Sequence, residues 1–121
     1  MIKTYLKGSR AERELLRILS SRGYSCVRSA SSGGFHSPVD IIAMKHGKIL
    51  SFEIKSWSRK PKVDKKRLER FKKWSENAGA ISFIAWYNKN KWLFLPLKDA
   101  ENSNYEDTNW INLNDFLRIF L

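Results

Sequence analysis

Apolar residues recur at helical spacing in three segments of this chain, residues 9–22, 63–77 and 113–120. The first segment opens on Ser9, a suitable N-cap, and stops at Gly23, while the second has Lys and Arg on the side opposite its apolar residues. The spacing therefore predicts three amphipathic helices, one near each end of the chain and one in the middle.

Shorter segments between these helices have the composition of strands, because they are rich in β-branched and aromatic residues and are bounded by turn residues. These predicted strands are residues 25–29, 40–45, 48–55, 81–87 and 92–97. His46-Gly47 and residues 88–91 join two pairs of them as hairpins, whereas residues 30–38 form a Ser/Gly-rich loop and residues 98–109 a polar connector. The order α-β-β-β-α-β-β-α predicts an α/β (α+β mixed) fold, with a central mixed five-stranded sheet flanked by helices.

The composition is that of a small folded domain. With 121 residues, 42% of them apolar, we expect one compact domain over residues 1–121. No stretch approaches the roughly 20 apolar residues of a membrane span, and the N-terminus lacks the apolar region of a secretory signal. The single cysteine, Cys26, fits a reducing compartment. We therefore expect a cytoplasmic protein with no membrane partner.

The net charge is strongly positive and unevenly placed. The chain carries 23 Lys and Arg against 12 Asp and Glu, a formal charge of +11, and nine of the basic residues fall within residues 59–73. This pattern favours a polyanionic partner, nucleic acid first and an anionic membrane surface second, although a solvated basic face is an alternative. The DNA contacts that we expect from this region are Lys60, Lys62, Lys66 and Arg67.

Two carboxylates and an ammonium are expected on one side of the first hairpin. Asp40 lies six residues before His46 and Glu53 six residues after Gly47, so the two come side by side when the chain reverses. Lys55 follows Glu53 by two residues and shares its face of the strand. Adjacent carboxylates repel each other unless a cation joins them, and their oxygens suit Mg²⁺, with Mn²⁺ as a substitute.

This cluster suits metal-dependent hydrolysis of a phosphodiester. Lys55 would orient or deprotonate the attacking water, or neutralise charge in the transition state. Glu-x-Lys is a common tripeptide, however, and an ordinary surface ladder of Glu and Lys is the alternative reading of the spacing.

The wider sequence resembles a known family. Residues 38–40 (PVD) and 53–55 (EIK) resemble the PD-(D/E)xK nuclease signature, with one extra residue between the Pro and the Asp. Several further segments resemble the archaeal Holliday junction resolvases and occur in that family's order. These segments are residues 7–9 (KGS), 11–15 (AEREL), 27–30 (VRSA), 40–43 (DIIA) and 53–56 (EIKS).

The resemblance implies a restriction-endonuclease-like fold and a homodimeric, Mg²⁺-dependent enzyme that nicks opposing strands of four-way junction DNA, with no small-molecule cofactor. It implies that Glu12 is a third metal carboxylate beside Asp40 and Glu53, and that Arg28 binds phosphate. Other implied DNA contacts are Lys7, Ser31 and Ser32. The alternatives are a solvated glutamate at Glu12, a surface ion pair at Arg28, a passive linker at the serines and an ordinary surface lysine.

The segment after the Glu-x-Lys strand departs from the family's pattern. Related nucleases often carry a Gln on the following helix, whereas this chain reads DKKR at residues 64–67. Either that role is absent, or Lys66 or Arg67 has become a DNA contact. For the dimer we expect apolar surface on the middle helix and second hairpin, with the C-terminal helix as the rival; the named candidates are Phe71, Trp74, Trp92 and Phe94.

Two other functions remain open from the residues alone. One is a related PD-(D/E)xK nuclease that acts on a different DNA structure, and the other is a DNA-binding module without catalytic activity. The presence of Glu12, Asp40, Glu53 and Lys55 together argues against the second, because a lapsed nuclease would lose some of them.

Overall fold

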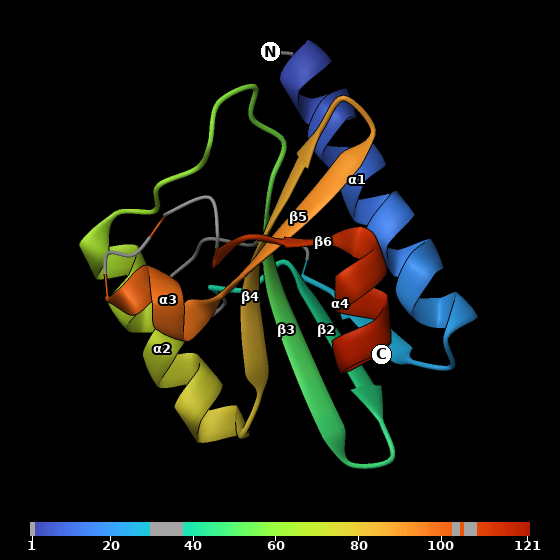
Figure 1. The fold of residues 1–121 in the computed structure, drawn as a ribbon, viewed down its shortest axis with the longest axis vertical. Coiled ribbons are helices and arrows are strands. Elements are labelled where there is room, and N and C mark those ends of the chain that lie inside the picture. The colour runs from blue at the N-terminus through green and yellow to red at the C-terminus, as the bar shows by residue number, and fades with distance from the viewer. Residues whose placement is uncertain (1, 30–37, 103–104, 106–108) are drawn as a thin grey trace.

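A six-stranded sheet runs through the molecule in the order β1-β2-β3-β4-β5-β6, and helices pack on both of its faces (Figure 1). The structure is a computed structural model that describes residues 2–29, 38–102, 105 and 109–121, with the backbone alone for residues 2–8. All neighbouring strands are antiparallel except the central pair β3 and β4. The strands are β1 (Ser25–Arg28), β2 (Ile41–Lys45), β3 (Lys48–Lys55), β4 (Ile81–Asn88), β5 (Lys91–Pro96) and β6 (Ile111–Asn112).

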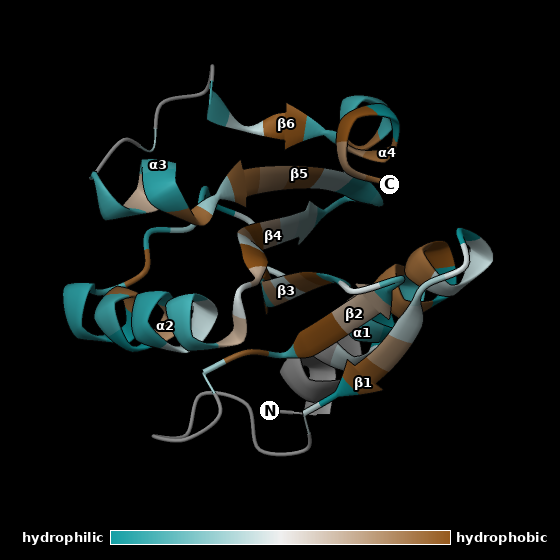
Figure 2. Ribbon diagram, turned by 90° about the horizontal axis from the view of Figure 1, so that it is seen from below, coloured by the Kyte–Doolittle hydropathy of each residue, from teal (hydrophilic) through white to brown (hydrophobic). Residues whose placement is uncertain are grey.

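The helices divide between the two faces of the sheet. One face carries α1 (Ile2–Ser21) and α4 (Leu113–Phe120), and the other carries α2 (Lys65–Ala78) and α3 (Leu97–Glu101) (Figure 2). Each face has its own apolar cluster, centred on Phe52 and Phe116 beneath α1 and α4 and on Phe71 and Ile84 beneath α2 and α3. Figure 2 shows α2 mostly in hydrophilic colours, because only one side of it meets the sheet.

Strand β3 separates these two cores by simple alternation. Leu50 and Phe52 belong to the cluster beneath α1, whereas Ser51 and Glu53 are buried from the opposite face. Glu53 is level with Ile84 of β4, which packs beneath α2. The strand therefore delivers a carboxylate into a largely apolar layer between sheet and helix.

Local capping fixes where α2 begins and ends. The Asp64 side chain accepts a hydrogen bond from the backbone N–H of Arg67 at 3.2 Å, as an N-cap does. At the other end Gly79 takes a left-handed conformation, with φ 67°, and its N–H bonds to carbonyls of the last turn. Arg67 consequently belongs to a well-defined first turn, directly above the sheet.

The predicted fold class is confirmed, and the predicted elements occur in the predicted order, with two short elements, α3 and β6, added between β5 and α4. The sheet has six strands rather than five, because residues 111–112 pair with β5. The first helix starts at Ile2, so Ser9 lies within it rather than at its N-cap. The expected polar connector 98–109 contains most of α3, whose Leu97 and Ala100 are buried. Within the described residues, no helix is long and apolar enough to cross a membrane.

The prediction of the surface that forms a dimer contact is partly wrong. Phe71 and Phe94 have no exposed surface and Trp92 has almost none, because these rings fill the protomer's own core. Phe94 stacks on Phe116 of α4 with ring centroids 3.9 Å apart. Of the named candidates only Trp74 retains partial exposure, whereas α4 presents the exposed side chain of Ile119.

Candidate active site

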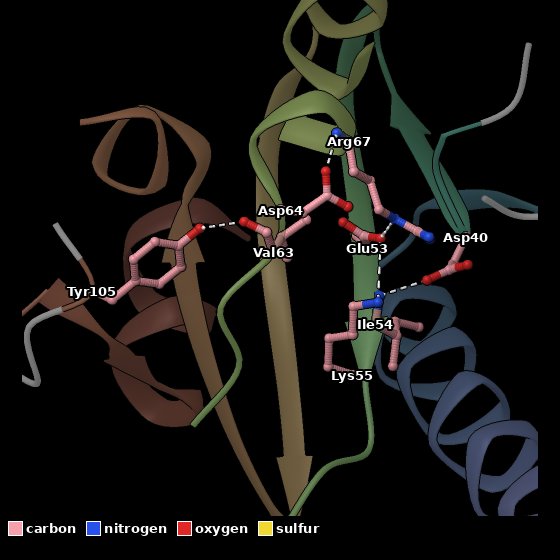
Figure 3. Close-up of polar contacts among 8 residues, drawn as sticks. All are labelled: Asp40, Glu53, Ile54, Lys55, Val63, Asp64, Arg67 and Tyr105. Carbon is pink, nitrogen blue, oxygen red and sulfur yellow. Dashed lines mark hydrogen bonds and ion pairs between the residues drawn. The ribbon is translucent and has the colours of Figure 1, made fainter. Parts of the chain in front are cut away.

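Asp40 and Glu53 lie beside each other at the open end of the β2–β3 hairpin. Ile41 is paired with Phe52, and the backbone N–H of Asp40 donates to the carbonyl of Phe52 at 2.8 Å. Asp40 Oδ2 in turn accepts from the N–H of Ile54 at 2.6 Å (Figure 3). These bonds hold the two carboxylates side by side, as their equal distance from the turn predicts.

Glu53 is an unusual carboxylate because it has no solvent-exposed surface. Burial raises the pKa of its side chain; the positive charges of Lys55 and Arg67 lower it, and the charge of Asp40 raises it. The folded protein thus holds a costly negative charge at this position, and nearby cations offset part of the cost.

The two carboxylates fit a divalent metal ion. Oε2 of Glu53 is buried and has no hydrogen-bond partner among the described residues, so this oxygen is available as a ligand for a cation. Asp40 is 6% exposed, so the pair sits at the edge of the buried layer rather than deep within it. Carboxylate oxygens are the donors that Mg²⁺ and Mn²⁺ prefer.

Lys55 stands next to this pair. Its Nζ lies 3.5 Å from Oε1 of Glu53 and 4.9 Å from the centre of the Trp57 ring. The side chain is 15% exposed, so its ammonium is both close to the carboxylates and reachable from solvent. The spacing of two residues along β3 therefore does bring Glu53 and Lys55 together.

Arg67 contacts the same carboxylate from α2, the helix that covers this face of the sheet. Its Nε forms an ion pair with Oε1 of Glu53, and in Figure 3 the guanidinium extends past Glu53 in the direction of Asp40. The side chain is 26% exposed. Arg67 lies in the segment where related nucleases often carry a Gln. It thus contacts Glu53, the central carboxylate of the site.

Glu12 is placed differently from the other two acids. Its carboxylate forms an ion pair with Arg28 of β1, in which Arg28 Nε donates to Glu12 Oε2. Among the residues that the structure describes, no three His, Cys, Asp or Glu side chains form a group that could hold a metal ion. Asp40 and Glu53 are thus brought together, whereas Glu12 pairs with the arginine that was expected to bind phosphate.

The expected DNA contacts on the connector and α2 are mostly at the surface. Lys60, Lys62 and Lys66 are exposed, and Lys60 Nζ also donates to the backbone carbonyl of Tyr105 at 3.0 Å. Ser31 and Ser32 lie outside the described residues, as does the side chain of Lys7.

Two aromatic residues near the site were not anticipated from the sequence. Trp57 is 43% exposed beside Lys55, and its carbonyl accepts a hydrogen bond from the Trp86 indole at 2.7 Å. Tyr105 is close enough for the charge of Glu53 to help raise the pKa of its phenol, although burial is the main cause. The position of Trp57, two residues after Lys55, was a usable signal; no local pattern points to Tyr105.

Comparisons with known proteins identify the family of the chain. Residues 3–120 match the family described as "Archaeal holliday junction resolvase (hjc)". The crossover junction endodeoxyribonuclease Hjc of Methanocaldococcus jannaschii is 38% identical over 104 residues, which are 84% of this chain and 75% of that protein. Hje of Saccharolobus islandicus is 32% identical, covering 93% of this chain and 87% of that protein.

A solved structure shows the same architecture. The Holliday junction resolvase Hjc of Archaeoglobus fulgidus superposes with a TM-score of 0.63 at 28% sequence identity, over 75% of this chain and 78% of that chain. Sequence and structure therefore lead to the same conclusion: the chain belongs to the archaeal Holliday junction resolvase family.

Proposed function

We propose that the chain is a structure-selective DNA endonuclease that resolves four-way junctions, and that Asp40 and Glu53 hold the Mg²⁺ ion that it uses, with Mn²⁺ able to substitute. The observation that carries the proposal is the buried carboxylate pair with an unpartnered oxygen at Glu53 and the ammonium of Lys55 beside it. Resolvase nucleases generally need a divalent metal ion. When bound, such an ion supplies Lewis-acid stabilisation of the charge that develops on the phosphate.

The surrounding residues position and neutralise the substrate. Lys55 projects from the strand that carries Glu53, where its ammonium would face a phosphate that approaches the carboxylates. It would orient the attacking water or balance the charge of the transition state. Glu12 is retained as a third carboxylate on the strength of the family resemblance alone. It lies on α1, which covers the sheet face opposite to Glu53, and its present partner is Arg28.

The basic surface is the proposed DNA footprint. The net charge of +11 and the exposed lysines after β3 support contacts to phosphates, including those of Lys60, Lys62 and Lys66. Lys7, Ser31 and Ser32 are retained as further proposed contacts on the strength of the family resemblance alone. We propose a cytoplasmic location, because the proposed substrate is DNA inside the cell.

Arg28 provides a test of phosphate binding. Arg28→Ala is expected to weaken junction binding by about three- to tenfold, as loss of one charge-assisted contact does, and to reduce cleavage as well. The log–log dependence of binding on salt should become shallower by roughly 0.7–0.9, since one phosphate contact is lost. Fluorescence anisotropy at several salt concentrations measures both quantities. An unchanged slope would show that Arg28 serves only its ion pair with Glu12.

A homodimer would match the approximate two-fold symmetry of a four-way junction and present two equivalent sites. Its test is a supercoiled plasmid that extrudes a cruciform. Paired nicks made within one binding event convert the plasmid directly to the linear form, whereas a single site that acts alone leaves nicked circles. We expect linear product with Mg²⁺ or Mn²⁺ and none in EDTA. Nicked circles throughout would contradict paired action, and cleavage in EDTA would contradict the metal.

A further inference from the structure

Arg67 lies against the carboxylate that the proposed metal ion would bind. It pairs with Glu53 Oε1, the carboxylate is fully buried, and the guanidinium extends toward Asp40 (Figure 3). Lys55 lies 3.5 Å from the same oxygen, so Glu53 already has two cations on one side. A divalent ion added between Asp40 and Glu53 would place a further positive charge against these groups, which is electrostatically unfavourable unless one of them moves.

Of these two cations, Arg67 is the one positioned to move. Its backbone is fixed by the Asp64 cap, but its side chain crosses from α2 to the sheet and is 26% exposed. Lys55 is less exposed, at 15%, and also contacts the face of the Trp57 ring. Rotation of the Arg67 side chain would carry its guanidinium from the buried layer to the surface beside the exposed lysines.

From this placement we infer that Arg67 is an internal competitor of the metal ion that becomes a phosphate-binding residue once the ion displaces it from Glu53. This inference rests on the proposed metal site at Asp40 and Glu53. A guanidinium suits both roles, because its planar fork binds carboxylate and phosphate in the same manner. Metal and DNA would then assist each other. The metal ion releases Arg67 from Glu53 so that it can bind phosphate, and a phosphate that holds Arg67 leaves Glu53 to the metal ion.

The first test measures metal affinity without DNA or activity. Electron paramagnetic resonance of unbound Mn²⁺ gives the dissociation constant for the wild-type protein and for Arg67→Gln, Arg67→Lys and Lys73→Ala. Lys73 is exposed on α2 and controls for the loss of one positive charge. Arg67→Gln is expected to bind Mn²⁺ about tenfold more tightly, because no cation then competes for the carboxylate. Arg67→Lys and Lys73→Ala should stay within about twofold of wild type.

Glu53→Gln separates failure of this inference from failure of the proposed function. If Glu53→Gln retains full Mn²⁺ affinity, Glu53 is not a metal ligand and the proposed site itself is refuted. If Glu53→Gln loses Mn²⁺ while Arg67→Gln binds it no more tightly than wild type, the metal site stands and competition by Arg67 is overturned. Thermal unfolding confirms that each variant is folded. Where Arg67→Gln is not folded, Arg67→Met takes its place as an uncharged variant, with the same expected gain in Mn²⁺ affinity and the same overturning result.

The second test uses junction binding in EDTA, where no metal takes part. While Glu53 holds Arg67, Arg67→Gln should change the junction dissociation constant by less than about twofold; in a Glu53→Gln background, where the arginine is released, it should weaken binding by about three- to tenfold. Such non-additivity would show that the Glu53 carboxylate keeps Arg67 from binding a DNA phosphate. Equal effects in both backgrounds would overturn the second role.

Discussion

Glu53→Gln and Asp40→Asn are each expected to lower the single-turnover rate of junction cleavage by at least about 10³-fold, since they remove the oxygens that hold the metal ion and several kcal/mol of transition-state stabilisation with them. Junction binding should survive or tighten, because each change removes a negative charge close to the approaching phosphates. The amide replacements preserve size. Asn at position 40 can still accept the hydrogen bond that Asp40 Oδ2 receives from Ile54, which alanine would leave unmade.

Glu76→Gln is the matched control for this pair. Glu76 lies on α2 and is exposed, so its change alters net charge by the same amount far from the hairpin cluster. Quench-flow or manual time courses on an end-labelled junction, with enzyme in excess, give the rates. Retention of more than about a tenth of the wild-type rate in either active-site variant would refute the assignment of these carboxylates. Such a rate would mean that the carboxylate lowers the activation free energy by less than about 1.4 kcal/mol.

Lys55→Ala is expected to reduce the same rate by roughly 10²–10⁴-fold, the range for a side chain that transfers a proton or balances transition-state charge. Binding should fall far less, because many other cations contribute to it. The ammonium lies 3.5 Å from Glu53, close to where the phosphate must sit to reach both carboxylates. Its loss thus removes a charge from the reacting centre rather than from the footprint.

Lys55→Arg distinguishes the two roles of the lysine. A guanidinium keeps the positive charge but does not give up a proton at accessible pH. If Lys55 balances charge, the arginine variant should retain a larger share of the rate than the alanine variant. Equal rates for the two variants would instead favour proton transfer. A Lys55→Ala rate close to that of wild type would remove Lys55 from the chemistry altogether.

The hairpin cluster was predictable because its geometry is local. Asp40 and Glu53 are equally distant from a two-residue turn, and alternation along β3 fixes Glu53 and Lys55 on one face. The order of the longer elements along the chain and most of their bounds follow from similar local patterns. The predicted ends of β3 and α4 agree with the structure to the residue.

The contacts that were missed depend on tertiary packing. The sequence predicted Arg67 as a DNA contact and as one of two candidates for an altered role. It did not predict the contact with Glu53, because nothing local shows that the first turn of α2 lies over that residue. Trp92 and Phe94 were expected at a dimer surface, yet α1 and α4 cover them; an apolar strand face looks the same in sequence whether its own helices or a partner conceal it. The two-residue β6 is too short to leave a pattern.

The most direct measurement of the central claim compares cleavage of a fixed four-way junction with cleavage of its linear arms, in Mg²⁺ and in EDTA, by the same preparation. The Asp40–Glu53 site in a resolvase predicts nicks in the junction with Mg²⁺, little or no cutting of the linear duplex, and no cutting of either in EDTA. Equal cleavage of junction and linear arms would contradict junction resolution, and undiminished cleavage in EDTA would contradict the metal site.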